Sequence, residues 1–353
     1  MFSHIGDISL VYWILFLIMA FGAYSEEQLP YKPRRDLQFI GLCALILISG
    51  LRYEMSDYNE YRGVYYFDYF QFEPGYEFLQ NIFSGLGVPF EIFVFIFAVI
   101  SCVFLKKAFS KYWFFWGMLL VLAKLATFYA MSGMRQWMAL CICFYAISLL
   151  LNGEKRKFVF WVIIAFTFHR SAFIVLPLIF LYKRDFSYTL ALIITVLAVI
   201  IGYSAKEFLF AAAEAIELFD ATGYLIDNET GINTLNWIEN FAFLIMGLAI
   251  RKKVIDKVPH YDFFLYMMLI YCAFLIAGSD FGIIKRLRDY YVLSYYIILP
   301  SISLAFRKQE RPVLNTIIIL YFGLLFIRSL DYFYLIAQYK CVLFADNMYN
   351  MMY

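Results

Sequence analysis

Apolar runs follow one another along almost the entire chain, and short polar stretches separate them. The runs occupy residues 8–24, 37–51, 91–105, 112–131, 134–151, 158–168, 171–182, 187–203, 237–250, 262–277, 290–306 and 313–328. A helix that crosses the hydrocarbon core of a bilayer needs about 20 predominantly apolar residues. The pattern therefore predicts an all-α polytopic integral membrane protein with about 12 transmembrane helices, some of them short or broken.

The composition agrees with a membrane protein. Of the 353 residues, 64% are hydrophobic and 16% are charged, whereas a soluble domain is roughly half apolar and a quarter charged. None of the polar stretches is long enough for a separate soluble domain. We therefore expect residues 1–353 to form a single membrane-embedded domain, with two longer segments between its helices, 52–90 and 204–236.

The loops between the runs set the orientation. Alternate loops carry the basic residues Lys32, Arg34, Arg35, Lys106, Lys107, Lys111, Lys155, Arg156, Lys157, Lys183, Arg184, Arg251, Lys252, Lys253, Lys257, Arg307, Lys308 and Arg311. Because Lys and Arg are enriched in cytoplasmic loops, these loops are assigned to the cytoplasm. Both termini and the two longer segments then face outward.

The two short runs 158–168 and 171–182 are expected to form a hairpin whose tip is His169. A single crossing would instead place Lys183 and Arg184 outside and invert every later loop. Each run has about a dozen residues and reaches roughly 17 Å, well under the ~30 Å hydrocarbon core. The tip should therefore lie below the outer surface and line a water-accessible pocket.

Several arginines fall on the outer face, against the overall charge bias. They are Arg52, Arg62, Arg135, Arg170, Arg286 and Arg288. Cations at the mouth of an apolar bundle are costly unless an anion compensates them, which predicts a site for a phosphorylated, membrane-embedded substrate. Arg135 also opens a helix, where a cation opposes the macrodipole and a bound anion would relieve that opposition.

Structural roles are the alternatives for these residues. Arg52 can reach the lipid headgroups or pair with Glu54 or Asp57, and Arg288 can pair with the adjacent Asp289. His169 can serve as a structural side chain bonded to a neighbouring carbonyl. Of the two arginines before residue 290, we expect Arg286 to face inward.

The first outer segment is rich in tyrosine and acids. Its tyrosines are Tyr53, Tyr58, Tyr61, Tyr65, Tyr66, Tyr69 and Tyr76. This composition suits carbohydrate binding, and an interfacial aromatic belt is the alternative. The chain has no GxxxxGK[ST] loop, GxGxxG, DxD or HExxH sequence, so we expect neither a metal nor a cofactor.

Short motifs in a fixed order resemble the EpsG family of polysaccharide-biosynthesis membrane proteins, within the wider class of Wzy-type polymerases. The motifs are Gly50-Leu51-Arg52-Tyr53 followed by Asp57-Tyr58 and Tyr61, Phe72-Glu73-Pro74-Gly75-Tyr76-Glu77, Met134-Arg135-Gln136, Phe168-His169-Arg170-Ser171-Ala172, Arg286 before Tyr290-Tyr291, and Tyr339-Lys340-Cys341-Val342. The resemblance covers roughly residues 10–345.

The resemblance implies a metal-independent glycosyltransferase of the bacterial cytoplasmic (inner) membrane, with its active site facing the periplasm or the cell exterior. Such enzymes polymerise undecaprenyl-diphosphate-linked oligosaccharide repeat units into O-antigen, capsule or exopolysaccharide. The expected partners are the lipid-linked donor and acceptor, the bilayer and a chain-length regulator, and nucleic acid is not among them.

Roles follow for individual residues. Diphosphate binding is assigned to Arg52, Arg135, Arg170 and Arg286, because arginines suit bidentate phosphate contacts. Lys340 is added to this set through the family motif alone. The sugar is assigned to Tyr58, Tyr61 and Gln136. Asp57 or His169 is the candidate base for the acceptor hydroxyl, and the alternative is that neither acts as one. We expect Arg52, Arg135 and Arg286 to converge on one outward-opening cavity.

Two other functions stay open. A transporter or flippase of lipid-linked oligosaccharide would use similar basic pockets without chemistry, although it should show repeat symmetry, which this sequence does not. A glycan ligase or a sugar acyltransferase with a catalytic His is the other alternative.

Overall fold

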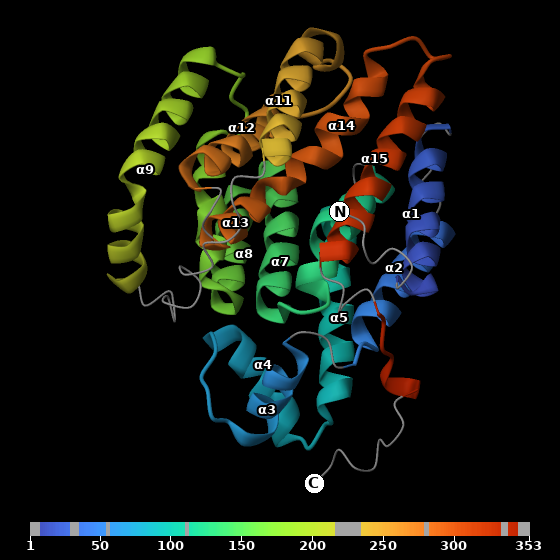
Figure 1. Cartoon of the computed structure of the whole chain (residues 1–353), viewed down its shortest axis with the longest axis vertical. Helices are drawn as coiled ribbons and strands as arrows, with labels where there is room; N and C mark the ends of the chain where they lie inside the picture. The colour runs from blue at the N-terminus through green and yellow to red at the C-terminus, as the bar shows by residue number, and fades with distance from the viewer. Residues whose placement is uncertain are drawn as a thin grey trace. The chain divides into compact units, whose positions relative to one another are not determined.

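The computed structural model describes residues 8–28, 35–53, 57–109, 113–215, 234–278, 282–332 and 338–344, and all regular secondary structure within them is helical (Figure 1). The helices are α1 (Leu10–Gln28), α2 (Arg35–Gly50), α3 (Tyr58–Phe67), α4 (Pro74–Gly85), α5 (Phe90–Ala108), α6 (Phe114–Val121), η2 (Leu122–Ala130), α7 (Met134–Leu151), α8 (Lys155–Phe168), η3 (Arg170–Phe180), α9 (Tyr188–Ala215), α11 (Thr234–Val254), α12 (Tyr261–Gly278), α13 (Gly282–Arg288), η4 (Asp289–Ser294), α14 (Tyr295–Leu304), α15 (Arg311–Tyr332) and η5 (Val342–Phe344). The all-α prediction is confirmed for these residues.

Every predicted apolar run coincides with a helix or with two helices in succession. By length and composition, three of the described helices qualify as membrane spans, namely α7, α12 and α15. The shorter apolar helices include α2, η3 and the α6–η2 pair. The structure thus supports a helical protein with three clear candidate spans, and the number of about 12 spans stays a prediction.

Three helices differ from the expected regular α-helices. The run that begins with α6 continues as a π-helix, η2, and η3 is a 3-10 helix that contains Pro177. A 3-10 helix rises about 2.0 Å per residue, so the 11 residues of η3 span about 22 Å rather than the roughly 17 Å expected for α-helix. The helix expected to end at residue 203 extends without a break to Ala215, so the second outer segment begins within α9.

The helix type changes between α8 and η3. The α-helical hydrogen bonds end when the His169 amide donates to Ala165 O (3.0 Å). Within unit 2, the Lys155 Nζ lies 5.6 Å from the centre of the Tyr182 ring, just beyond the end of η3. The break at His169 is confirmed, whereas the predicted hairpin and the topology that depends on it stay predictions.

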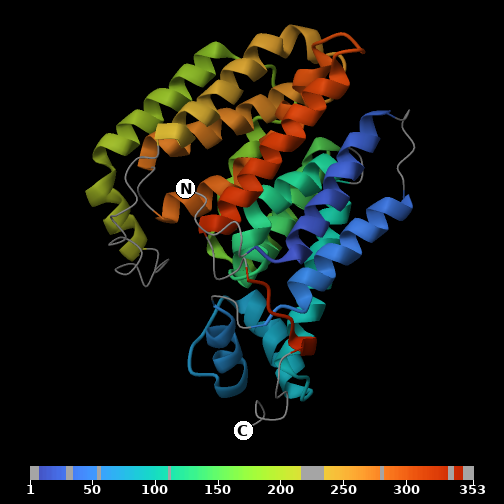
Figure 2. The same cartoon turned by 45° about the vertical axis from the view of Figure 1, so that its right-hand side comes forward.

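The chain divides into two compact units. Unit 1 contains residues 1–149, 157–169 and 315–353, and unit 2 contains residues 150–156 and 170–314. In unit 1, α7 is largely buried, and α1 packs against both α2 and α6 (Figures 1 and 2). Glu26 on α1 accepts the amide of Phe115 (2.9 Å), which satisfies a free donor in the first turn of α6.

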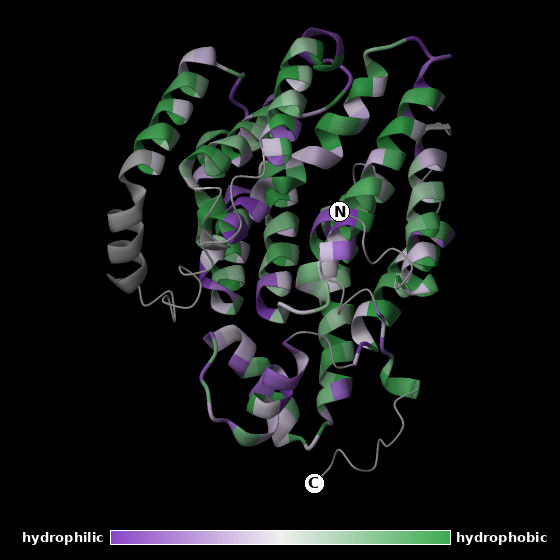
Figure 3. Ribbon diagram, in the orientation of Figure 1, coloured by the Kyte–Doolittle hydropathy of each residue, from purple (hydrophilic) through white to green (hydrophobic). Residues whose placement is uncertain are grey.

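The first outer segment is itself helical, because α3 and α4 form two short helices ahead of α5. They carry more polar residues than the long helices, as the hydropathy colouring shows (Figure 3). Tyr65 donates to Val88 O (2.7 Å), and the Phe90 amide donates to the Tyr66 hydroxyl (3.1 Å). These bonds tie α3 to the beginning of α5.

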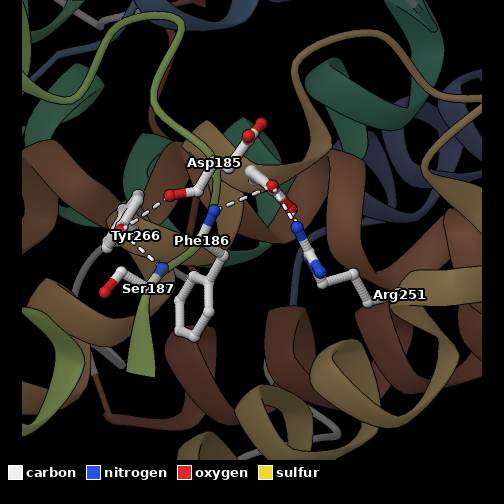
Figure 4. A network of polar contacts seen from close by, with 6 residues as sticks. Asp185, Phe186, Ser187, Arg251 and Tyr266 are labelled. Atoms are coloured by element: carbon white, nitrogen blue, oxygen red, sulfur yellow. Dashed lines mark hydrogen bonds and ion pairs between the residues drawn. The ribbon is translucent and has the colours of Figure 1, made fainter. Parts of the chain in front are cut away.

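In unit 2, α12 is the central helix and packs against α9, α11, α13 and α14. A polar network joins its first turn to the segment that follows η3 (Figure 4). Arg251 forms a bidentate pair with Asp262, with both N–O distances 2.6 Å, and Asp262 also accepts the Phe186 amide (2.9 Å). The Tyr266 hydroxyl accepts from the Ser187 amide (2.8 Å) and donates to Asp185 O (3.1 Å).

This network leads to a prediction about stability. Replacing Asp262 by Ala leaves the Phe186 amide without its acceptor and, among the described residues, removes the carboxylate partner of Arg251, at a cost of about 2–4 kcal/mol. The thermal unfolding midpoint of purified protein should fall by several degrees. Replacing the exposed Lys253 by Ala is the control and should leave the midpoint unchanged. Equal midpoints for the two variants would contradict the structural role of the pair.

Candidate functional site

The first and the last of the short motifs found in the sequence are paired in unit 1. The Tyr53 amide donates to Lys340 O (2.9 Å), and the Val342 amide donates to Leu51 O (2.9 Å). These two bonds form an isolated antiparallel bridge between Arg52 and Cys341. We call this pairing of residues 51–53 with residues 339–342 the terminal clasp. It fixes the backbone on both sides of Arg52.

Tyr339 anchors the clasp to the surrounding helices. Its amide donates to Ser9 Oγ (2.8 Å), and its hydroxyl donates to Leu47 O (3.4 Å). Its ring makes an edge contact with Tyr12, with 5.9 Å between ring centres. The clasp therefore holds together the beginning of α1, the end of α2 and the segment that follows α15.

Arg52 is buried, with 4% of its surface exposed. Its Nη1 donates to Ser49 O (2.5 Å), and its Nε is buried without a hydrogen-bond partner. Burial lowers the pKa of Arg52 below its usual value, and nearby tyrosines, Tyr58 and Tyr61 first among them, partly oppose that shift. The predicted pairing of Arg52 with Asp57 is not seen, and Glu54 lies outside the described residues. Such a cation is costly to bury unless an anion binds to it.

Arg135 is the second residue of α7, and a carboxylate of the chain itself compensates it. Its Nη1 lies 2.5 Å from Glu73 Oε2, and its Nε donates to the Tyr61 hydroxyl (3.3 Å). The guanidinium lies over the Phe72 ring, 4.2 Å from its centre. An acidic group near a helix N-terminus is favourable, so Glu73 stands where the sequence predicted a ligand anion.

The sequence around Glu73 explains how it reaches Arg135. Glu73 has extended backbone before α4, and Pro74 occupies the first helical position, where a missing amide proton costs nothing. A Cβ at Gly75 would lie 2.3 Å from Thr167 Oγ1 and 2.8 Å from Thr167 O. Only glycine therefore lets the start of α4 pack this closely against the end of α8.

Tyr61 and Tyr76 complete the site. Both are buried, and their rings lie 5.6 Å apart. Burial raises the pKa of both hydroxyls, so they stay protonated at neutral pH and can donate; the charge of Arg135 lowers both pKa values, and Arg52 also lowers that of Tyr76. The Tyr76 hydroxyl has no hydrogen-bond partner.

We call Arg52, Tyr61, Tyr76, Arg135 and Glu73 the arginine–tyrosine cluster. Among the residues that the structure describes, two of its buried donors have no acceptor, Arg52 Nε and the Tyr76 hydroxyl. Two such donors beside the Arg135 guanidinium suit an anion with several oxygens, such as a diphosphate.

The other residues predicted in unit 1 lie around this cluster. Asp57 precedes α3, and its charge raises the pKa of Tyr61. Tyr58 is buried against Phe90 and donates to Glu91 (3.4 Å), and Gln136 is buried on α7. Lys340 is exposed on the terminal clasp. His169 follows the α8 turn that touches Gly75.

Arg62 and Arg288 have carboxylate neighbours. Arg62 Nε lies 3.5 Å from Glu91. The predicted pairing of Arg288 with Asp289 is confirmed at 3.7 Å, and the Arg288 guanidinium lies 4.9 Å from the centre of the Tyr271 ring.

Arg170 and Arg286 belong to unit 2, where their segments pack together. The Ser171 and Tyr290 hydroxyls are hydrogen-bonded (3.0 Å), and Tyr291 donates to Ile174 O (2.5 Å). The start of η3 therefore lies beside α13 and η4. Because Arg52 and Arg135 are in unit 1, the expected convergence of these arginines on one cavity stays a prediction.

Sequence analysis did not assign Glu73, Tyr76 or Phe72 to the site. Their signal was the motif Phe72-Glu73-Pro74-Gly75-Tyr76-Glu77, in which an acid precedes a proline at a helix start. The residue contacted by that acid lies on α7 and could not be read from local sequence.

The fold and the cluster together define a helical membrane protein with a buried cationic site. The chain belongs to the EpsG family, whose sequence model matches residues 37–341. This confirms the resemblance and indicates a membrane protein of polysaccharide biosynthesis with a glycosyltransferase-like, polymerase-like role. No curated protein and no solved structure matches the chain significantly.

The terminal clasp gives a prediction about Arg52. Replacing Val342 by Pro removes the amide that donates to Leu51 O and leaves that carbonyl unsatisfied, at a cost of about 1–3 kcal/mol. Trypsin should then cut after Arg52 at least several-fold faster than in the wild-type protein. The Val342→Ala variant keeps the amide and is the control. Equal protection of Arg52 in both variants would show that the clasp does not hold this segment.

Proposed function

We propose that this protein polymerises undecaprenyl-diphosphate-linked oligosaccharide repeat units at the outer face of the bacterial cytoplasmic membrane. The observation that carries the proposal is the buried Arg52, whose Nε has no acceptor, in a cluster with Tyr76 and Arg135. Family membership supplies the chemical context of polysaccharide synthesis. A lipid-linked diphosphate is an anion of that context that would compensate both guanidinium groups.

The proposed reaction transfers the growing glycan from its lipid carrier. A sugar hydroxyl of the acceptor forms a bond to the anomeric carbon of the donor, and the bond between that carbon and the diphosphate oxygen breaks. The electron pair stays on the departing undecaprenyl diphosphate. Arg52 and Arg135, in contact with the bound diphosphate, stabilise this charge, which is the main electrostatic requirement of the step. The hydroxyl proton passes to a base, for which Asp57 and His169 are the candidates from sequence.

The other residue assignments form part of this proposal. Arg170 and Arg286 of unit 2, with Lys340 of the clasp, add contacts to the diphosphate. Tyr58, Tyr61 and Gln136 bind the sugars. The product is O-antigen, capsule or exopolysaccharide, and a chain-length regulator is a candidate partner. The Arg135→Lys variant retains the positive charge but loses the planar guanidinium group, which bonds to Glu73 and to Tyr61 at the same time.

The first functional prediction concerns Arg135. Purified protein supplied with lipid-linked repeat units, extracted from source cells that lack this gene, should give a ladder of products. Arg135→Lys should reduce the rate by about 100-fold, because removal of one well-placed donor typically costs that much. The exposed Arg184→Lys is the control and should retain the wild-type rate.

The outcome separates the candidate functions. A transporter or flippase would move the lipid-linked units across vesicles without lengthening them. A ligase or acyltransferase would modify a different acceptor and give a single product rather than a ladder. Normal polymerisation by Arg135→Ala at normal insertion would remove Arg135 from the site.

The proposed orientation places both termini and the arginine–tyrosine cluster outside, with about 12 spans and all six basic loops in the cytoplasm. The predicted hairpin at His169 makes Lys183 the decisive position, because a single crossing would put it outside. In a cysteine-free background, Lys183→Cys should resist an impermeant maleimide in intact spheroplasts and react after permeabilisation. Asn59→Cys, on the exposed surface of α3, is the control and should react in both. Labelling of position 183 from outside would overturn this topology.

A further inference from the structure

Glu73 holds Arg135 through a carboxylate that makes no other hydrogen bond or ion pair with the described residues. It precedes α4 yet makes no capping hydrogen bond to that helix. Its side chain is 12% exposed, whereas that of Arg135 is 26% exposed. The Arg135 side chain is therefore the more exposed partner of the pair.

Two neighbouring carboxylates have other partners. Glu77 accepts the Phe72 amide (2.6 Å), and Glu91 interacts with Arg62 (3.5 Å) and Tyr58 (3.4 Å). Asp57 lies in the turn before α3, and its charge acts on Tyr61. Within the described part of the first outer segment, Glu73 is the carboxylate in direct contact with an arginine assigned to the diphosphate.

We infer that Glu73 is a catalytic residue, the base that takes the proton of the acceptor hydroxyl, and that donor binding releases it for this task. The inference rests on the proposed function. In the structure without substrate, Glu73 is the anion that neutralises Arg135. The donor diphosphate carries more negative charge and can also reach Arg52 Nε and the Tyr76 hydroxyl, so it takes Arg135 from Glu73.

The exchange links binding of the donor to activation of the acceptor. While Glu73 is paired with Arg135, the guanidinium occupies one of its carboxylate oxygens. Once Arg135 has turned to the diphosphate, that oxygen can accept a hydrogen bond from the acceptor hydroxyl. Glu73 then accepts the hydroxyl proton as the hydroxyl oxygen bonds to the anomeric carbon and the diphosphate leaves with the bonding electrons. The proton later passes from Glu73 to water.

The test compares binding with turnover in the full-length protein. Glu73→Gln removes the base and also the anion that competes for Arg135. Turnover at saturating lipid-linked repeat units should fall by at least 100-fold, the usual contribution of a general base. Affinity for undecaprenyl diphosphate should remain equal to wild type or rise by up to about tenfold. A merely structural Glu73 would instead lose binding and turnover together.

Two further variants make the comparison sharper. Glu73→Asp retains a carboxylate and should recover part of the turnover, whereas the exposed Glu60→Gln should behave as wild type.

The outcomes separate this inference from the proposed function. If wild-type protein makes no ladder, the proposed function fails. If it does and Glu73→Gln keeps near-normal turnover, Glu73 is not the base. In that second case, loss of turnover at saturation in Asp57→Asn or His169→Ala would assign the role to the residue concerned. Weaker binding of undecaprenyl diphosphate by Glu73→Gln would also overturn the inference that the diphosphate displaces Glu73 from Arg135.

Discussion

The burial of the Arg52 guanidinium and the partial burial of that of Arg135 are the constraint that organises unit 1. A cation removed from water loses its hydration, and the surroundings must return hydrogen bonds or a negative charge. Arg135 receives both, from Glu73 and Tyr61. Among the described residues, Arg52 receives the Ser49 carbonyl and a set of neutral tyrosines. This imbalance between the two residues favours an anionic ligand at the cluster over a purely structural ion pair.

The surrounding architecture holds these groups in place from distant parts of the chain. The terminal clasp brings residues 339–342 to the backbone of Arg52. Gly75 lets α4 approach the end of α8, and this contact sets the position of Glu73. Side chains fixed by backbone pairing and close helix packing are well suited to electrostatic stabilisation, because they need little reorganisation when charge develops.

The bond between Glu73 and Arg135 also gives the family motif around residue 73 a physical meaning. A proline at the first helical position keeps the preceding residue extended, which turns the Glu73 side chain away from its own helix. That acid can therefore serve a neighbouring helix. A site that neutralises its own cation until substrate arrives avoids the cost of an empty cationic pocket at the membrane surface.

The sequence alone determined the helices, because a chain in lipid must satisfy its backbone internally and apolar runs mark where it does so. It also determined the helix break at His169 and the pairing of Arg288 with Asp289, the latter through their adjacency. Family membership followed from short motifs in order. Only the tertiary structure decided that Glu73 meets Arg135 and that the last motif pairs with residues 51–53. These contacts join segments far apart in the chain, and they depend on helix packing, for which local periodicity carries no information.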